Sequence, residues 1–513
     1  MDGHIAIPVW LFVLLIIVTF AAVLDRVLIP STRWFIRRRI SRVIDEISTR
    51  LDIEIRPFQL TKRQVLIDRL VYDPKVIEAV QAFAQEKKMP REVAQAKVIA
   101  YAKEIVPSFN AYLYFRIGYW VAKKVARLLY RVRVGYVDNE DLAKVDPNST
   151  VVFVMNHRSN MDYVLVAFLA AERTTLSYAV GEWARIWPLQ MLIKYMGAFF
   201  VRRNSGNRLY RQVLERYIHM ATKEGVCQAV FIEGGLTRDG CLRPPKLGLL
   251  DYMLRGFEPG RDRDIVFIPV GINYDRTLED RSLLHEIKPH PEKRSGWFIF
   301  KTVAGFISNN LSLMVRNKWE RFGFACVNFG HHISVGRYCL ENGINFSSMD
   351  RETRFPEVEK LSYRLLDSIK AIIPVLPVPL AAFVLIENRN KWMTEFDLKA
   401  QIYNLMEDLK RNGATVNVPD KSREETINSA INMLKIRKMI IQHDGHLKAD
   451  PDMLDILSYY ANSIVQWRQN KELQNKEVQN HDMKITADLQ KKDATEYSKE
   501  DVRMKKSSVP VTS

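Results

Sequence analysis

A histidine and an aspartate stand close together at the end of a short apolar run. His157 and Asp162 lie in "VVFVMNHRSNMDY" (151–163), with four residues between them. Histidine has an unperturbed pKa of about 6.5, so its ring can accept a proton near neutral pH. A carboxylate that binds one ring N–H fixes the tautomer and stabilises the imidazolium that forms. The spacing therefore predicts a general base with its orienting acid, although an ordinary polar turn is the alternative for a single such pair.

The position of the pair after a strand-like run is typical of a functional site. In α/β sheets, functional groups collect at the carboxyl ends of strands, and His157 follows the apolar run "VVFVM" closely. A helix that begins soon after His157 would place Asp162 about one turn further on, facing the ring. The chain has no G-x-S-x-G motif, so the base would activate a hydroxyl group of the substrate rather than a serine of the protein.

Basic residues in three further blocks could bind a phosphate group. The blocks are "GAFFVRR" (197–203), "FIEGGLTRDG" (231–240) and "PPKLG" (244–248). A dianionic phosphate needs converging cations, and arginine is suited to bidentate binding. Glycines let the backbone approach a ligand closely. The available cations are Arg202, Arg203, Arg238 and Lys246.

The elements that must position these side chains alternate between two patterns. The runs "TVVFVM", "QAVFIE" and "DIVFIPVGI" are short and apolar, and helical stretches such as "NRLYRQVLERYIHMATKEG" lie between them. Strands that alternate with helices predict an α/β domain. We place it at 136–390, as a mixed central sheet flanked by helices, and expect "FACVNFG" (324–330) to be one more strand.

The regions on either side of this domain have helical patterns. Residues 31–135 have apolar positions at spacings of three and four, which predicts a helical N-terminal region. For the aromatic and basic stretch at 109–134, a core-packing helix and a helix in the membrane interface both remain open. A second stretch of this kind is 297–319.

The C-terminal part is also expected to be mainly helical. Residues 371–386 are apolar but short and contain three prolines, so we interpret them as a buried segment rather than a membrane span. Residues 391–467 predict helices and then a hairpin at Asp444-Gly445, an order that can make a winged-helix-like module. Residues 468–513 are polar and charged, which predicts a disordered tail.

The N-terminus predicts a membrane anchor over residues 1–30. Residues 5–24 carry no charge and are close to the ~20 residues that a helix needs to cross a bilayer. A cleaved signal peptide normally has a basic start and an A-x-A site, and neither is present. Five arginines between 33 and 42 follow. By the positive-inside rule they place the catalytic domain on the cytoplasmic face of the cell's inner membrane.

Composition limits the classes of partner. The chain has 513 residues and a formal net charge of +17, which indicates anionic partners such as phosphorylated substrates or acidic membrane phospholipid. The four cysteines form no CxxC pair, which fits a reducing compartment. The membrane span and the arginines tied to strand ends argue against a nucleic-acid partner. The histidines show no metal-ligand spacing, so no metal is expected.

Four blocks in this order resemble those of the glycerolipid acyltransferase superfamily. They are H-x-x-x-x-D with His157 and Asp162, "GAFFVRR", E-G-G with Glu233, and a short apolar block with a central proline, here Pro269. The stretches "HRSNMDY", "PPKLG", "VNFG" and "LSYYANS" (457–463) are most similar to glycerol-3-phosphate and dihydroxyacetone-phosphate acyltransferases. The resemblance covers about residues 75–465.

The resemblance implies acyl transfer from an acyl thioester to the first hydroxyl of glycerol 3-phosphate, giving lysophosphatidate. The donor would be acyl-CoA or acyl-carrier protein, and no cofactor is implied. His157 would take the hydroxyl proton, Asp162 would hold the ring, and Glu233 would order its loop or bind a substrate hydroxyl. The implied substrate-binding residues are Arg202, Arg203, Glu233, Gly234, Gly235, Arg238, Lys246 and Pro269.

One position departs from the family pattern. Relatives usually have arginine directly after the E-G-G triplet, and here the residue is Leu236. We therefore expect Arg203 and Arg238 to carry more of the phosphate binding, and an arginine restored at 236 to join them. Acceptors such as dihydroxyacetone phosphate or lysophosphatidate, and a non-catalytic lipid-binding role, remain alternatives.

Overall fold

The computed structural model describes residues 57–468, apart from 112, 137–141, 143, 171–175, 182–188, 203–204, 281–321 and 420–421. The predicted anchor, the aromatic stretch at 297–319 and, except for Arg468, the predicted tail lie outside the described residues. Within the described residues, no helix is both long enough and apolar enough to cross a bilayer.

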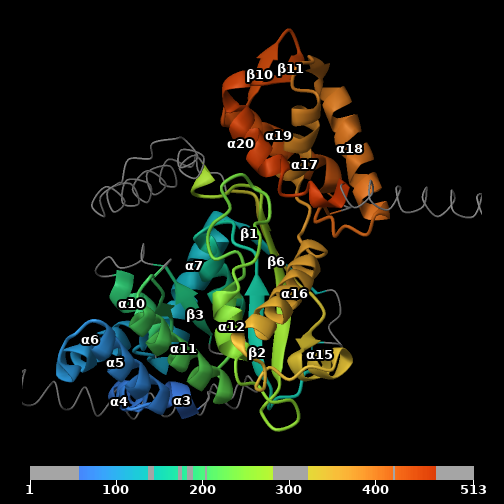
Figure 1. Cartoon of the computed structure of the whole chain (residues 1–513). Helices are drawn as coiled ribbons and strands as arrows, with labels where there is room; N and C mark the ends of the chain where they lie inside the picture. Colours follow the sequence, from blue (N-terminus) through green and yellow to red (C-terminus); the bar gives the residue numbers. More distant parts are fainter. Residues whose placement is uncertain are drawn as a thin grey trace, which may run out of the picture.

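Among the described residues, eight strands form a mixed sheet at the centre of the protein (Figure 1). Strand β6 pairs with β7 and β8 in antiparallel fashion, and the other pairs are parallel. This confirms the predicted α/β class with a mixed sheet. The strand order is β1 (Arg131–Tyr136), β7 (Phe324–Phe329), β6 (Ile265–Tyr274), β2 (Thr150–Met155), β5 (Gln228–Phe231), β3 (Ser177–Val180) and β4 (Phe199–Phe200), with β8 (Ile333–Ser334) beside β6.

Both faces of the sheet are covered, because alternate residues of a strand point to opposite faces. Val152 and Val154 of β2 belong to one hydrophobic core, and Met155 belongs to another, with Phe153 packed against it. Helices α7 (Tyr119–Leu129) and α9 (Met161–Ala170) cover the Met155 side. The Val152 side is covered by α11 (Arg208–Lys223), α12 (Gly248–Leu254), α15 (Val335–Asn342) and α16 (Arg351–Lys370).

From residue 57 on, the described part of the predicted N-terminal region (31–135) is mainly helical, with one correction. It contains α3 (Pro57–Leu60), α4 (Arg63–Val71), α5 (Pro74–Glu86), α6 (Arg91–Ile105) and the short π-helix η2 (Leu113–Gly118). Residues 131–135, expected to be helical, instead belong to strand β1, which pairs with β7. The alternating sequence "RVRVGY" has the period of a strand.

Helix α7 has one packed face and one exposed face. Ala122, Ala126 and Leu129 are buried against the core, whereas Trp120 and Leu128 are exposed. The core-packing interpretation is therefore correct for the buried face, and contact between the exposed face and lipid stays a prediction.

The C-terminal module has a hydrophobic core of its own. The prediction of a buried segment at 371–386 is confirmed. Residues 377–387, which the sequence assigns to the 136–390 domain, instead form a helix of this module. The helix tolerates Pro377 and Pro379 because they stand in its first turn. The module consists of α17 (Pro377–Glu387), β9 (Met393–Thr394), α18 (Glu395–Arg411), α19 (Arg423–Ile436), β10 (Ile440–His443), β11 (His446–Ala449), the 3₁₀-helix η5 (Pro451–Met453) and α20 (Leu454–Ala461).

The predicted hairpin is present between β10 and β11. Asp444 and Gly445 both have positive φ, as a tight two-residue hairpin turn requires, and β9 adds a third strand beside β11. Figure 1 shows this module at one end of the central sheet, away from α3–α6.

Candidate active site

His157 and Asp162 meet at the carboxyl end of the central strand β2. His157 lies two residues beyond β2, and Asp162 stands in the first turn of α9. The His157 Nδ1 atom is 2.9 Å from Asp162 Oδ2, and both residues are buried. The same oxygen accepts the backbone N–H groups of Arg158 (2.7 Å) and Ser159 (3.0 Å). Because Oδ2 acts as an acceptor for three donors, Nδ1 carries the ring proton.

The other ring nitrogen of His157 is therefore the basic one. Nε2 is buried and has no hydrogen-bond partner among the described residues. The ring stacks on Phe231, with centroids 3.9 Å apart, and Tyr163 contacts it edge-on. His157 lines a cavity of about 1030 Å³. A nitrogen fixed as an acceptor at the wall of a cavity can take a proton from a bound hydroxyl group.

Tyr274 completes the support of the pair and was not predicted from the sequence. Tyr274 is the last residue of β6, and its hydroxyl group donates to Asp162 Oδ1 at 2.6 Å. The tyrosine is fully buried, and burial raises the pKa of its phenol well above the usual value, so the hydroxyl keeps its proton. Asp162 is thus held through both oxygens, which fixes the plane of its carboxylate toward the ring.

Glu233 joins the loop after β5 to the histidine. Its two oxygens accept the backbone N–H groups of His157 and Arg243, each at 2.8 Å. Burial raises the pKa of Glu233 to about 7, and the two N–H groups oppose that rise. Both oxygens are bonded to backbone, which supports the loop-ordering role expected for Glu233 over contact with a substrate hydroxyl.

The loop 233–246 brings cations to the same part of the cavity. Thr237 donates its N–H to the carbonyl oxygen of His157 at 2.9 Å. Gly234 has φ +65°, and a side chain there would meet Lys246 Cγ at 2.7 Å, so glycine is required. The cavity is lined here by Gly234, Gly235, Arg238, Arg243 and Lys246. Arg243 was not predicted, because no sequence motif marks it. The structure identifies it through its backbone N–H bond to Glu233 and its place at the cavity wall.

Three other predicted site residues have different outcomes. Arg202 lines the cavity, but its guanidinium pairs with Glu104 of α6 at 2.9 and 2.6 Å, so its charge is already balanced. Arg203 lies outside the described residues. Pro269 is buried within β6, opposite Val154 of β2, and does not line this cavity. Its position in the middle of the sheet indicates a packing role.

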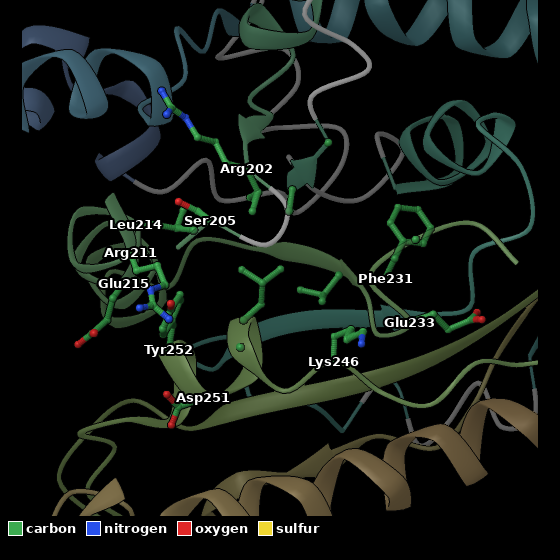
Figure 2. Close-up of a pocket in the computed structure, with 18 of the residues that line it drawn as sticks. Arg202, Ser205, Arg211, Leu214, Glu215, Phe231, Glu233, Lys246, Asp251 and Tyr252 are labelled. Atoms are coloured by element: carbon green, nitrogen blue, oxygen red, sulfur yellow. The ribbon is translucent and has the colours of Figure 1, made fainter. Parts of the chain in front are cut away.

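The cavity has two distinct ends. Figure 2 shows Phe231, Glu233 and Lys246 at one end and Arg211, Glu215 and Tyr252 at the other. We call these the histidine end and the distal end. The residues named for the distal end come from α11 and α12, and α16 lies beside them, since its Arg354 pairs with Asp251.

The C-terminal module packs directly against the loop 233–246. Gly240 has φ +87°, and a side chain there would clash with the carbonyl oxygen of Tyr459. Asn462 donates to the carbonyl oxygen of Asp239 at 2.9 Å, and the Arg158 guanidinium lies over the Tyr459 ring. Leu236 packs against the hydrophobic core of the module. The residue that departs from the family pattern is therefore an interface residue, and it does not line the cavity.

Two family profiles match the chain. The profile described as "Acyltransferase" matches residues 134–273, and that described as "Glycerol-3-phosphate acyltransferase C-terminal region" matches residues 310–468. The first covers the blocks that carry His157, Glu233 and Pro269, and the second covers α15 through α20.

Curated relatives described as glycerol-3-phosphate acyltransferases come from several bacteria. The chain is 26% identical over 425 residues to "Glycerol-3-phosphate acyltransferase" of Alteromonas mediterranea, covering 79% of this chain and 50% of that protein. It is 32% identical over 286 residues to the protein of that description from Pseudomonas entomophila, covering 55% of this chain and 33% of the relative. The chain thus spans about half the length, or less, of these relatives.

A solved structure of a 1-acyl-sn-glycerophosphate acyltransferase from Thermotoga maritima is similar over 60% of this chain and 98% of that chain. The sequence identity is 17% and the TM-score is 0.29, which is too low to support an inference.

Proposed function

We propose a reaction for this chain on the premise that it belongs to the glycerol-3-phosphate acyltransferase family, of which it carries the acyltransferase domain and the C-terminal region. The proposed reaction moves an acyl chain from an acyl thioester to the first hydroxyl group of glycerol 3-phosphate, and the product is lysophosphatidate. The observation that carries the proposal is the state of His157. Asp162 holds Nδ1, and Nε2 has no hydrogen-bond partner among the described residues and lies at the wall of the cavity.

The chemistry follows from that geometry. His157 Nε2 accepts the proton of the acceptor hydroxyl as its oxygen attacks the thioester carbonyl carbon. The new C–O bond forms, the C–S bond breaks, and the imidazolium returns its proton to the leaving thiolate. Asp162 stabilises the transient imidazolium through Nδ1–H, as a carboxylate does in serine hydrolases.

The acceptor's phosphate would lie on the cations of the loop 233–246. Arg238 and Lys246 were predicted for this role, and Arg243 joins them at the cavity wall. The contacts of Glu233 and Thr237 with His157 tie this loop to the base. A phosphate held there would present its glycerol hydroxyl groups to His157 Nε2.

The lipid product fits a location at a membrane. The predicted anchor at 1–30 and the arginines that follow it support a place at the cytoplasmic face of the inner membrane. Membrane phospholipid would then be a further contact of the protein.

The test is an assay of purified membranes that carry the full chain. Palmitoyl-CoA and palmitoyl-carrier protein are each offered with glycerol 3-phosphate, dihydroxyacetone phosphate and lysophosphatidate. We expect lysophosphatidate to form fastest from glycerol 3-phosphate, and His157→Ala to lose most of this activity. Faster acylation of another acceptor would replace the proposed substrate, and no transfer with any of them would favour a non-catalytic lipid-binding role.

A further inference from the structure

The cavity is much larger than the proposed acceptor requires. Its volume is about 1030 Å³, whereas pockets of about 300–1,000 Å³ enclose whole drug-sized ligands. Glycerol 3-phosphate at the histidine end would leave the distal end open. The acyl donor must place its thioester carbon beside His157, so the remainder of the donor is the natural occupant of the remaining space.

The acidic side chains of the distal end are already neutralised. Arg255 pairs with Glu215 at 2.6 Å and with Asp251 at 2.5 Å. Arg354 of α16 also pairs with Asp251, at 2.8 Å. Two carboxylates thus face two guanidinium groups, and these four side chains contribute no net charge to the cavity.

Three further arginines give the distal end its positive charge. Arg208, Arg211 and Arg351 are exposed and line the cavity. In the part of the chain that the structure describes, none of the three lies within salt-bridge distance of a carboxylate. Arg208 also borders a smaller cavity of about 270 Å³ beside α5, so Arg211 and Arg351 define the distal end most directly.

The placement of Arg208 and Arg211 is unfavourable without an anion. Both stand in the first turns of α11, which has no acidic residue in its first turn. The N-terminus of a helix carries partial positive charge, so cations near it are unfavourable. Residues three apart lie on the same helix face, so a single anionic group can contact both side chains.

We propose that the distal end binds the phosphate groups of the acyl donor's phosphopantetheine arm, through Arg208, Arg211 and Arg351. This inference rests on the proposed function. Coenzyme A and carrier protein both attach the acyl group to phosphopantetheine, so the shared ligand chemistry is a phosphate ester at the far end of that arm. An alkyl chain is a poor occupant, because it would remove water from three cations without pairing them.

The test compares donors that differ only in phosphate. Palmitoyl-CoA, palmitoyl-phosphopantetheine and palmitoyl-pantetheine are assayed with the full chain and with the Arg208→Gln/Arg211→Gln variant. We expect the wild type to prefer the two phosphorylated donors over palmitoyl-pantetheine by about tenfold or more in kcat/KM, since hydrogen bonds to charged groups are lost with the phosphate. In the variant this preference should largely disappear, while the KM for glycerol 3-phosphate stays as it was. Palmitoyl-carrier protein is added to learn whether the arm of the carrier protein is bound in the same way.

Lys223→Gln is the matched control. It removes one positive charge from the last turn of the same helix, outside the cavity, and should leave the donor preference intact. Arg351→Gln tests the site from α16 independently of α11. A preference that is equally strong in wild type and in both cavity variants would overturn the proposal. The proposal would also fail if the cavity variants raised the KM for glycerol 3-phosphate and left the KM for the donor unchanged. A wild type that transfers no acyl group with any donor would instead refute the proposed function.

Discussion

The hydrogen bonds of a few buried side chains decide whether His157 can work as a base. Both ring nitrogens have defined roles: Nδ1 faces Asp162, and Nε2, at the cavity wall, is unpaired within the part of the chain that the structure describes. The oxygen of Asp162 that accepts Nδ1–H also accepts two backbone N–H groups, and Tyr274 holds the second oxygen. The orientation of the base is thus set by contacts on one carboxylate.

His157→Ala removes the base while leaving the fold in place. Turnover should fall by about 10²–10⁴-fold, the usual cost of losing a general base. Asp162→Asn should also lose most activity, because its amide can no longer fix the tautomer through the same oxygen. Steady-state rates in membranes, together with thermal unfolding of both variants, measure this. Near-normal turnover of His157→Ala would refute the mechanism.

Tyr274→Phe deletes only the hydroxyl group that holds Asp162 Oδ1. We expect kcat to fall by about tenfold, a loss equivalent to about 1.4 kcal/mol, with the KM of both substrates little changed. In an Asp162→Asn background the same substitution should have almost no effect on kcat, because Tyr274 acts through Asp162.

Tyr130→Phe is the control for this substitution. Tyr130 is a buried tyrosine whose ring packs 5.3 Å from that of Tyr274 and whose hydroxyl group donates to the carbonyl oxygen of Arg276. Its hydroxyl group is therefore directed to Arg276 and not to Asp162. If both variants lose kcat to the same extent, or if the losses from Tyr274→Phe and Asp162→Asn simply add, Tyr274 has only a structural role.

Larger elements set which cations reach the substrate. The loop 233–246 is attached to His157 through Glu233 and Thr237, and the C-terminal module covers its outer side through Tyr459 and Asn462. The module therefore supports the conformation of the loop that carries the proposed phosphate ligands.

Arg238→Ala tests the phosphate role of this loop. Losing a hydrogen bond to a charged group costs roughly 1.5–3 kcal/mol, or about 10- to 150-fold in affinity. The loss should appear in the KM for glycerol 3-phosphate, with the donor KM little changed. An unchanged acceptor KM would leave Lys246 and Arg243 as the candidates among the described cations.

Leu236→Arg should not restore phosphate binding to Arg238→Ala, contrary to the expectation from sequence. Leu236 packs against the core of the C-terminal module, so a guanidinium there would lose its water without gaining a partner. We expect destabilisation of about 1–3 kcal/mol, visible as a lower unfolding midpoint. Leu236→Met, which keeps an apolar side chain of similar size, should be nearly neutral. Recovery of the acceptor KM in the double variant would show that position 236 reaches the phosphate.

On the scale of the whole molecule, one buried carboxyl group links the sheet to the C-terminal module. Asp275 follows β6 directly and accepts the N–H of Phe324 at the start of β7 (2.7 Å) and that of Val378 in the first turn of α17 (2.9 Å). Burial raises its pKa to about 7, opposed by these two N–H groups and by Arg131.

Asp275 should make stability depend on pH. Its pKa in the folded protein, about 7, is above the ordinary value of about 4 for an unfolded chain. At pH values between these two pKa values, the folded state binds the proton more tightly than the unfolded chain does. The stability that Asp275 contributes is therefore complete below pH ~4 and is lost as the pH rises through about 7. Urea midpoints of the purified chain at pH 6 and pH 8 measure it. Between pH 6 and pH 8 the urea midpoint should fall less in Asp275→Asn than in wild type. Asp262→Asn is a control for the loss of one charge, and its midpoint should fall as much as that of wild type. An equal fall of the midpoint in all three proteins would contradict the assignment.

The sequence by itself determined the features that depend on local geometry. His157 and Asp162 are five positions apart, and a turn followed by a helix brings them together without help from distant residues. The alternation of strands and helices, and the hairpin at Asp444-Gly445, also follow from local periodicity and turn chemistry.

The tertiary structure alone decided which distant partner each long or polar side chain meets. Tyr274 is 112 positions from Asp162, Glu104 is 98 positions from Arg202, and Leu236 meets a module that begins well over a hundred residues later. An arginine extends toward whichever carboxylate the fold places within reach, and no local pattern specifies that carboxylate. For this reason Arg202 was expected at the phosphate and is bound to α6, whereas Arg211 and Arg243 line the cavity without having been predicted.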